Sequence, residues 1–222
     1  MKKIEQVFRE ILHQAIEKKN FRLTQMELSE KLGFSLSTIN LAVKKLEKMN
    51  SIKIEKMSFK IIDVKKILYY WASFRNLEKD IIYKTRAEMP VREIEKLMPN
   101  IIYGGYSGYK FKFKKVEADY SEVYVYADEN ELEIIKKRFP ANNKNPNLFI
   151  LKKDENMKEM SLGQIFADLW NLKQWYASDF LKGLEEAFLR KENLQEVRAL
   201  PFTNQKKASG KEGRMTFREK NE

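Results

Sequence analysis

A glycine turn between two capped helical segments constrains this chain more than any other feature. Thr24 and Glu27 have the spacing of a capping box, in which the threonine hydroxyl accepts from the N3 amide and the glutamate returns to the cap amide. This pair predicts a helix that ends at Gly33, a residue suited to the left-handed C′ position. Ser35 or Ser37 then caps another helix. The order in this part of the chain is therefore helix, turn, helix.

Periodic apolar residues extend this pattern on both sides of the turn. From Ile4 to Ile16 they recur every three or four positions, which predicts an amphipathic helix. His13 lies off that stripe, so we interpret it as a surface residue rather than a metal ligand. After the turn, Ile39, Val43 and Leu46 form a buried stripe. The opposite face of the same helix displays Ser37, Thr38, Asn40, Leu41, Lys44, Lys45 and Lys48.

The period changes from helical to alternating after Asn50. Ile52 and Ile54 point one way, a tip follows at residues 56–58, and residues 59–62 return as a second strand. Together with the helices, this hairpin completes the winged helix-turn-helix order. Residues 24–52 resemble the winged-helix transcription regulators, and the likeness makes residues 1–65 one DNA-binding domain. In that family the third helix enters the major groove and the wing lies against the backbone.

The resemblance implies a set of DNA-contacting residues whose chemistry suits a duplex. Lysine ammonium groups gain charge-assisted contacts with phosphates and release counterions, while short hydroxyl and amide side chains at the helix start reach phosphates or base edges. Many relatives carry an arginine where this chain has Leu41, so base reading relies on Asn40 or on apolar contact with a thymine methyl. The predicted set is Ser35, Ser37, Thr38, Asn40, Leu41, Lys44, Lys45, Lys48, Lys53, Lys56 and Lys60. The alternative is a protein-docking module whose lysines form a solvated face.

The distribution of charge supports a polyanionic partner for the N-terminal region. The chain has 43 Lys+Arg against 32 Asp+Glu, a net charge of +11. Residues 1–65 hold 14 basic and 8 acidic side chains, and residues 66–202 are nearly neutral with 23 and 21. Residues 203–222 hold 6 and 3, have little apolar content, and are expected to be a disordered basic tail.

Composition also excludes several kinds of site. Without cysteine the chain has no disulfide, thiol catalyst or cysteine metal site, and one histidine excludes a multi-histidine metal site. The longest apolar run, residues 67–74, is far below the about 20 residues of a membrane span. We therefore expect a cytoplasmic protein without membrane contact, a monomer or a homodimer, with no cofactor and no metal.

The rest of the chain is read as a connector and a second domain, giving an α+β fold overall. Residues 66–90 are expected to form a helical connector that packs on an α/β domain at residues 91–192. Within that domain we expect a helix at 91–98, an apolar stretch with a glycine turn and a strand over 101–113, and further strands at 122–126 and 147–151. Asp128 caps a helix that runs to Phe139. Two helices, at residues 161–171 and 175–190, close the domain.

Short motifs in this second domain resemble the C-terminal domain of AbiEi-type antitoxins. They are the glycine-aromatic run at residues 104–111, the strand motifs at 123–126 and 147–151, and the tryptophan motifs at 167–172 and 175–181. Proteins of that family join a winged helix to an α/β domain in type IV toxin-antitoxin systems. The resemblance implies a repressor of its own operon that opposes a nucleotidyltransferase toxin, with that toxin as a partner of the second domain. A stand-alone regulator with the same domain pair is the competing interpretation.

An enzyme with a winged-helix targeting domain is a further alternative. Gly104 and Gly105 could cradle a phosphate, because glycines let backbone amides approach an anion. A nucleotidyltransferase also needs clustered carboxylates to hold two metal ions, and no Asp-x-Asp motif occurs. The four candidates, Asp119, Asp128, Asp154 and Asp168, are scattered over unlike elements. We therefore interpret the glycines as a tight turn before a strand, Asp168 as a core or interface residue, and the chain as a non-enzyme.

Concentrated aromatic residues leave one more alternative, a protein-interaction module without DNA binding. Eight tyrosines and phenylalanines lie between residues 103 and 126. Strand alternation would turn half of them outward and give an aromatic surface suited to a protein partner. They could equally fill both faces of a sheet that the closing helices cover.

Overall fold

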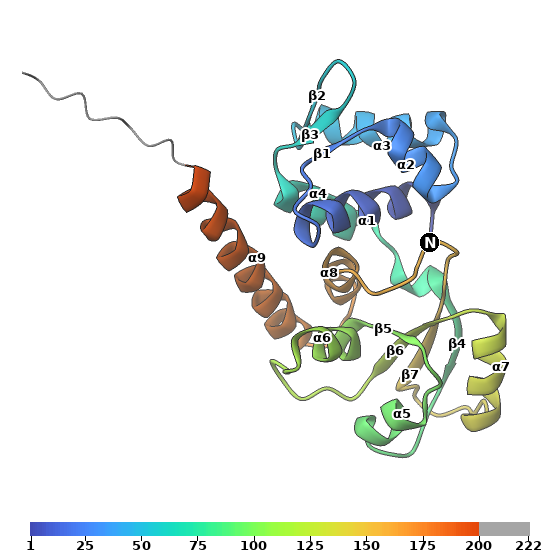
Figure 1. Cartoon of the computed structure of the whole chain (residues 1–222). Coiled ribbons are helices and arrows are strands. Elements are labelled where there is room, and N and C mark those ends of the chain that lie inside the picture. The colour runs from blue at the N-terminus through green and yellow to red at the C-terminus, as the bar shows by residue number, and fades with distance from the viewer. Residues whose placement is uncertain (200–222) are drawn as a thin grey trace, which may run out of the picture.

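A computed structural model describes residues 1–199 of the chain, with side chains to residue 188. It contains a winged unit at the top of Figure 1 and a four-stranded sheet at the bottom, with one helix between them. The expected α+β fold, an N-terminal winged helix-turn-helix followed by a mixed α/β domain with C-terminal helices, is confirmed. The expected tail at residues 203–222 lies outside the described part.

The winged unit consists of three helices and a small antiparallel sheet. Its helices are α1 (Lys3–Ile16), α2 (Gln25–Leu32) and α3 (Leu36–Lys48). Its strands are β1 (Arg22–Leu23), β2 (Ile52–Ile54) and β3 (Phe59–Ile61), in the order β1-β3-β2. The predicted caps are present, since the Thr24 hydroxyl accepts from the Glu27 amide and the Ser35 hydroxyl from the Thr38 amide.

The second unit is built on a mixed sheet of order β4-β7-β6-β5, in which only β6 and β7 run parallel. Its strands are β4 (Ile81–Thr85), β5 (Ile102–Gly104), β6 (Val123–Ala127) and β7 (Leu148–Lys152). Helices α5 (Val91–Leu97) and α7 (Glu129–Arg138) cover one face. Helices α6 (Gly105–Phe113), α8 (Leu162–Trp170) and α9 (Ala177–Ala199) belong to the other.

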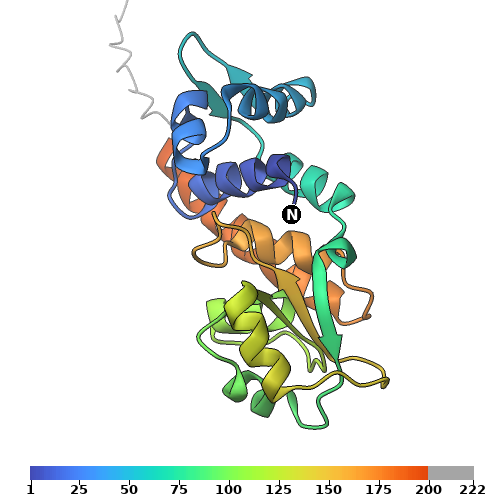
Figure 2. The ribbon, with the colours of Figure 1, turned by 90° about the vertical axis from the view of Figure 1, so that its right-hand side faces the viewer.

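Side chains of β6 alternate between two hydrophobic cores, one on each face of the sheet. Val123 and Val125 pack with the α5 and α7 side, whereas Tyr124 and Tyr126 pack into the larger core on the opposite face. That larger core continues through α8 and α4 (Val64–Phe74) into the winged unit, where it includes Phe8 of α1. A second view shows the same layering, with α8 between the winged unit and the sheet (Figure 2). The two units therefore share one hydrophobic core.

The expected helical connector is only partly correct. The helix ends at Phe74, a 3₁₀ turn follows at Leu77–Asp80, and Ile81–Thr85 forms strand β4 rather than helix. Ile81 satisfies a helical period, but it starts a run of apolar and β-branched residues that pairs antiparallel with β7. Tertiary pairing therefore overrides the local period here.

The expected strand after the glycine turn is wrong, because Gly105–Phe113 is helix α6. Both periods are present in the sequence, since Tyr109 and Phe113 fit alternation as well as the spacing of a helix. Packing decides between them: Tyr106 and Tyr109 are buried, each with its ring centroid 5.1 Å from that of Phe180.

The expectation of an outward aromatic surface is also wrong for four of its eight members. Tyr106, Tyr109, Tyr124 and Tyr126 are buried, and Phe111 is the member exposed at 39%. The alternative, in which these rings fill a core under the closing helices, is confirmed for these four tyrosines. Within the described part of the chain, no helix is both long and apolar enough to cross a membrane.

Candidate nucleic-acid interface

Helix α3 presents a mainly polar face because four of its apolar residues turn to the core. Ile39, Ala42, Val43 and Leu46 are buried beneath it. Gly33 directs the chain from α2 into α3 with φ = +66°, a conformation that costs a residue with a Cβ free energy. All eleven predicted contact residues are exposed or half-buried, none of them in the core.

The lysines of this face are available to an anion. Lys44, Lys45 and Lys48 on α3, and Lys53, Lys56 and Lys60 on the hairpin, are all exposed. Among the described residues, no carboxylate lies within ion-pair distance of any of the six. Their charges are therefore open to solvent or to phosphates.

The acidic residue of the hairpin is held by its neighbours. Glu55 Oε2 accepts from the Ser58 hydroxyl at 3.1 Å and lies 3.0 Å from Arg22 Nε of β1, while Arg22 Nη2 donates to Glu55 Oε1 at 3.2 Å. The Ser58 hydrogen bond, with the charge of Arg22, holds the pKa of Glu55 below its ordinary value. The negative charge of Glu55 is therefore paired with Arg22 within the winged unit.

The polar residues at the start of α3 are already linked to one another. The Ser35 hydroxyl lies 2.9 Å from that of Ser37 and 3.0 Å from that of Thr38. The Asn40 amide donates to Gln25 Oε1 of α2 at 3.1 Å, a contact that the sequence pattern did not indicate. Asn40 is therefore oriented by α2 before any ligand arrives.

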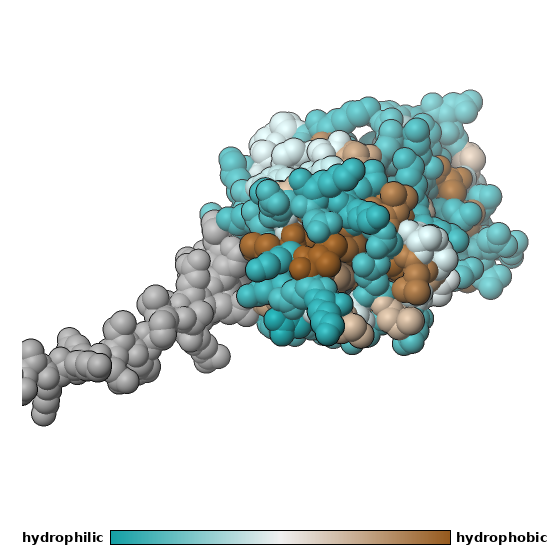
Figure 3. Space-filling model, turned by 90° about the horizontal axis from the view of Figure 1, so that it is seen from above, coloured by the Kyte–Doolittle hydropathy of each residue, from teal (hydrophilic) through white to brown (hydrophobic). Residues whose placement is uncertain are grey.

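Exposed apolar side chains also belong to this surface. Leu41 is 57% exposed in the middle of the α3 face, and Met57 at the hairpin tip is 82% exposed. Leu36 and Ile54 add to them. Seen from the winged end, the surface has apolar areas set among hydrophilic side chains (Figure 3). Met57 has no predicted role, although its place at the predicted hairpin tip indicates that it is exposed.

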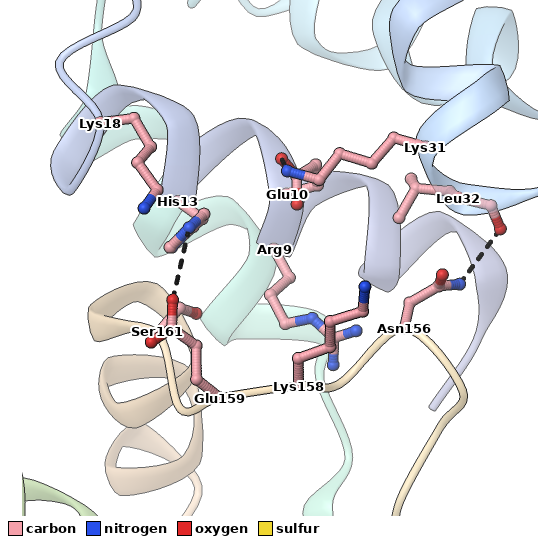
Figure 4. A pocket seen from close by; sticks show the side chains of 10 residues that line it. All are labelled: Arg9, Glu10, His13, Lys18, Lys31, Leu32, Asn156, Lys158, Glu159 and Ser161. Atoms are coloured by element: carbon pink, nitrogen blue, oxygen red, sulfur yellow. Dashed lines mark hydrogen bonds and ion pairs between the residues drawn. The ribbon is translucent and has the colours of Figure 1, made fainter.

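The loop after β7 in the second unit contacts helices α1 and α2 of the winged unit. Asn156, in the loop after β7, donates to the Leu32 carbonyl at 3.1 Å, and Asp154 accepts two hydrogen bonds from Arg9 at 2.8 and 2.7 Å. Arg9, Leu32 and Asn156 line a cavity of about 310 Å³ between α1, α2 and that loop (Figure 4). The loop thereby supports the end of α2 just before the turn into α3.

The glycines of the alternative phosphate cradle, Gly104 and Gly105, are closely packed. A Cβ at Gly104 would lie 2.9 Å from Tyr126, and one at Gly105 would lie 3.3 Å from Tyr124. Further along α6, a Cβ at Gly108 would lie 2.7 Å from the Tyr103 carbonyl oxygen. The space beside this strand-to-helix junction is thus occupied by side chains and backbone.

The four candidate carboxylates have separate surroundings. Asp168 is buried against Arg75, and Asp154 pairs with Arg9. Asp128 caps α7 together with Glu131, as predicted, and Asp119 is exposed. The expectation that Asp168 is a core or interface residue is confirmed.

The N-terminal unit has the fold of a winged helix-turn-helix domain. Residues 9–53 match a family model described as winged helix-turn-helix DNA-binding. Comparison with curated proteins found no match. The match runs from the middle of α1 into β2 and therefore includes the turn and all of α3.

Proposed function

We propose that this protein is a transcriptional regulator that binds duplex DNA, with α3 in the major groove and the β2–β3 wing against the backbone. The observation that carries the proposal is the open lysine face. Six exposed lysines without an ion pair among the described residues extend over α3 and the wing, while Glu55 is paired with Arg22. Such a face favours phosphate contact with counterion release.

The direct test is binding to DNA from upstream of the chain's own gene, compared with a random duplex of equal length. We expect tighter binding to the upstream fragment, as sequence readout through Asn40 or Leu41 requires. Equal affinity for both duplexes would reduce the protein to a non-specific binder. No binding to either would favour the protein-docking alternative.

The finer proposal is an antitoxin-like autorepressor, and its support is the resemblance of the second domain to AbiEi-type antitoxins. Its test adds the product of the neighbouring gene to the same assay. A product that inhibits growth alone, and is neutralised when this chain is co-expressed, supports the antitoxin role. A harmless neighbour would leave a stand-alone regulator.

We further propose that the protein is not an enzyme. The filled space beside Gly104 and Gly105 and the separate surroundings of the four carboxylates support this proposal. Purified protein, incubated with each labelled nucleoside triphosphate, magnesium or manganese, and RNA or protein acceptors, should transfer no label. Transfer that disappears when Asp119→Asn and Asp128→Asn are combined would instead support a nucleotidyltransferase-like enzyme.

A further inference from the structure

A second basic surface lies in a groove between the C-terminal half of α3 and helix α4. The groove has a volume of about 730 Å³. Its lining includes Lys45 and Lys48 from α3 and Lys65 and Lys66 from α4. Helix α4 lies outside residues 9–53, so the family match assigns nothing to its lysines.

The charges of this groove are mostly uncompensated. One acidic residue, Asp63, lines it with the four lysines. One oxygen of Asp63 accepts from the Lys66 amide at 2.8 Å as the cap of α4, and the other lies 4.0 Å from the Lys66 ammonium. Lys45, Lys48 and Lys65 have no ion-pair partner among the described residues. The groove is therefore a site for an anion rather than for a neutral ligand.

The floor of the groove is apolar and well supported. Tyr69 and Tyr70 line it together with Met49. The Tyr69 hydroxyl donates to Glu185 of α9, and its ring centroid is 5.4 Å from that of Phe166. The Tyr70 ring packs against Phe74 at 5.1 Å. Aromatic faces between lysines suit a chain that alternates apolar sugar with charged phosphate.

We infer that this α3–α4 groove holds the sugar-phosphate backbone of the same duplex that α3 engages, with Lys65 and Lys66 as phosphate contacts. The inference rests on the proposed function. Two of the four lysines, Lys45 and Lys48, belong to α3 itself, so the groove shares these residues with the open lysine face. This continuity favours DNA over an acidic protein segment, which would need no such connection. Contacts of this kind add affinity without sequence information.

The test is the salt dependence of DNA binding for the full chain with Lys65→Ala and Lys66→Ala combined. Fluorescence anisotropy with the upstream duplex and a random duplex, between about 50 and 200 mM salt, gives the slope of log affinity against log salt. We expect the slope to fall by up to about 0.9 for each lost phosphate contact. Affinity should fall by the same factor on both duplexes, and Lys65→Arg with Lys66→Arg should restore it.

A matched control removes two adjacent exposed lysines from α7, at the far side of the second unit: Lys136→Ala with Lys137→Ala. This control variant has the same net charge as the combined Lys65→Ala and Lys66→Ala variant, and it should keep the wild-type salt slope. If the wild-type chain binds DNA and the α4 variant has the same salt slope as the control, the inference is overturned. The proposed function would then still stand. A wild-type chain that binds neither duplex would overturn both. Circular dichroism checks that each variant is folded.

Discussion

Arg75 Nε donates to Asp168 Oδ1 at 3.0 Å, and this buried pair joins the end of α4 to α8. Arg75 also donates to Glu5 of α1, to Asp80 and to the Tyr126 hydroxyl. Burial alone would lower the pKa of Arg75, but the surrounding Tyr126 and carboxylates raise it well above its ordinary value, so the guanidinium stays charged. One side chain thus ties the winged unit to the sheet.

Replacing Arg75 should therefore cost much of the protein's stability. Arg75→Met leaves Glu5 and Asp168 buried without their cation, and breaking a buried pair in this way costs about 3–5 kcal/mol. Urea unfolding measures the loss. The control is Lys173→Ala, which breaks an exposed pair with Glu78 and should change the stability little. Equal losses for the two variants would contradict a buried tie between the units.

A second contact between the units joins Glu17, at the C-terminus of α1, to the Leu162 amide at the start of α8. This contact should make the stability of the protein depend on pH. Burial alone would raise the pKa of Glu17, but hydrogen bonds from His13 and the Leu162 amide, with Lys112 nearby, hold it below its ordinary value of 4.5. A lowered pKa in the folded state stabilises above about pH 4.5, and this stabilisation is lost as the pH falls through the folded-state value. Acid should therefore weaken this tie.

Glu17→Gln tests this sign. Near neutral pH the variant should be less stable than the wild type by about 1 kcal/mol, and the difference should shrink below about pH 4.5. Urea unfolding at a series of pH values measures it. Glu159→Gln, at a 62% exposed side chain 3.8 Å from His13, is the control and should change little. A gap between Glu17→Gln and wild type that widens in acid would refute the assignment.

Base reading by Asn40 is the third prediction. Asn40→Ala should cost about 1–3 kcal/mol on a site selected by the wild-type protein, and much less on random DNA, because the amide pairs bidentately with an adenine edge. Gln25→Ala removes the α2 partner of Asn40 but not the amide itself. It should lose less affinity than Asn40→Ala on the selected site. If Asn40→Ala loses equally on both DNAs, Asn40 does not read sequence.

The winged unit was predictable because its signals are local. Thr24, Gly33 and Ser35 act within one helical turn of their own position, so the caps and the turn follow from the sequence. Strand β4 and helix α6 could not be predicted in this way, because their secondary structure depends on partners far along the chain. Strand β4 pairs with β7, and α6 packs against Phe180. The lysines of α4 are not predicted as contacts for a related reason: only the packed structure places them beside α3.

The central claim is that the lysines of α3 and the wing bind phosphates. The most direct test is the salt slope of binding to the upstream duplex for Lys44→Ala, Lys45→Ala and Lys56→Ala combined. As the control, Lys96→Ala, Lys136→Ala and Lys137→Ala combined remove the same charge from exposed positions of the second unit. The account predicts a slope flatter by up to about 0.9 per lost contact for the first variant and a wild-type slope for the control. An unchanged slope in the first variant would place the DNA-binding face elsewhere and contradict the account.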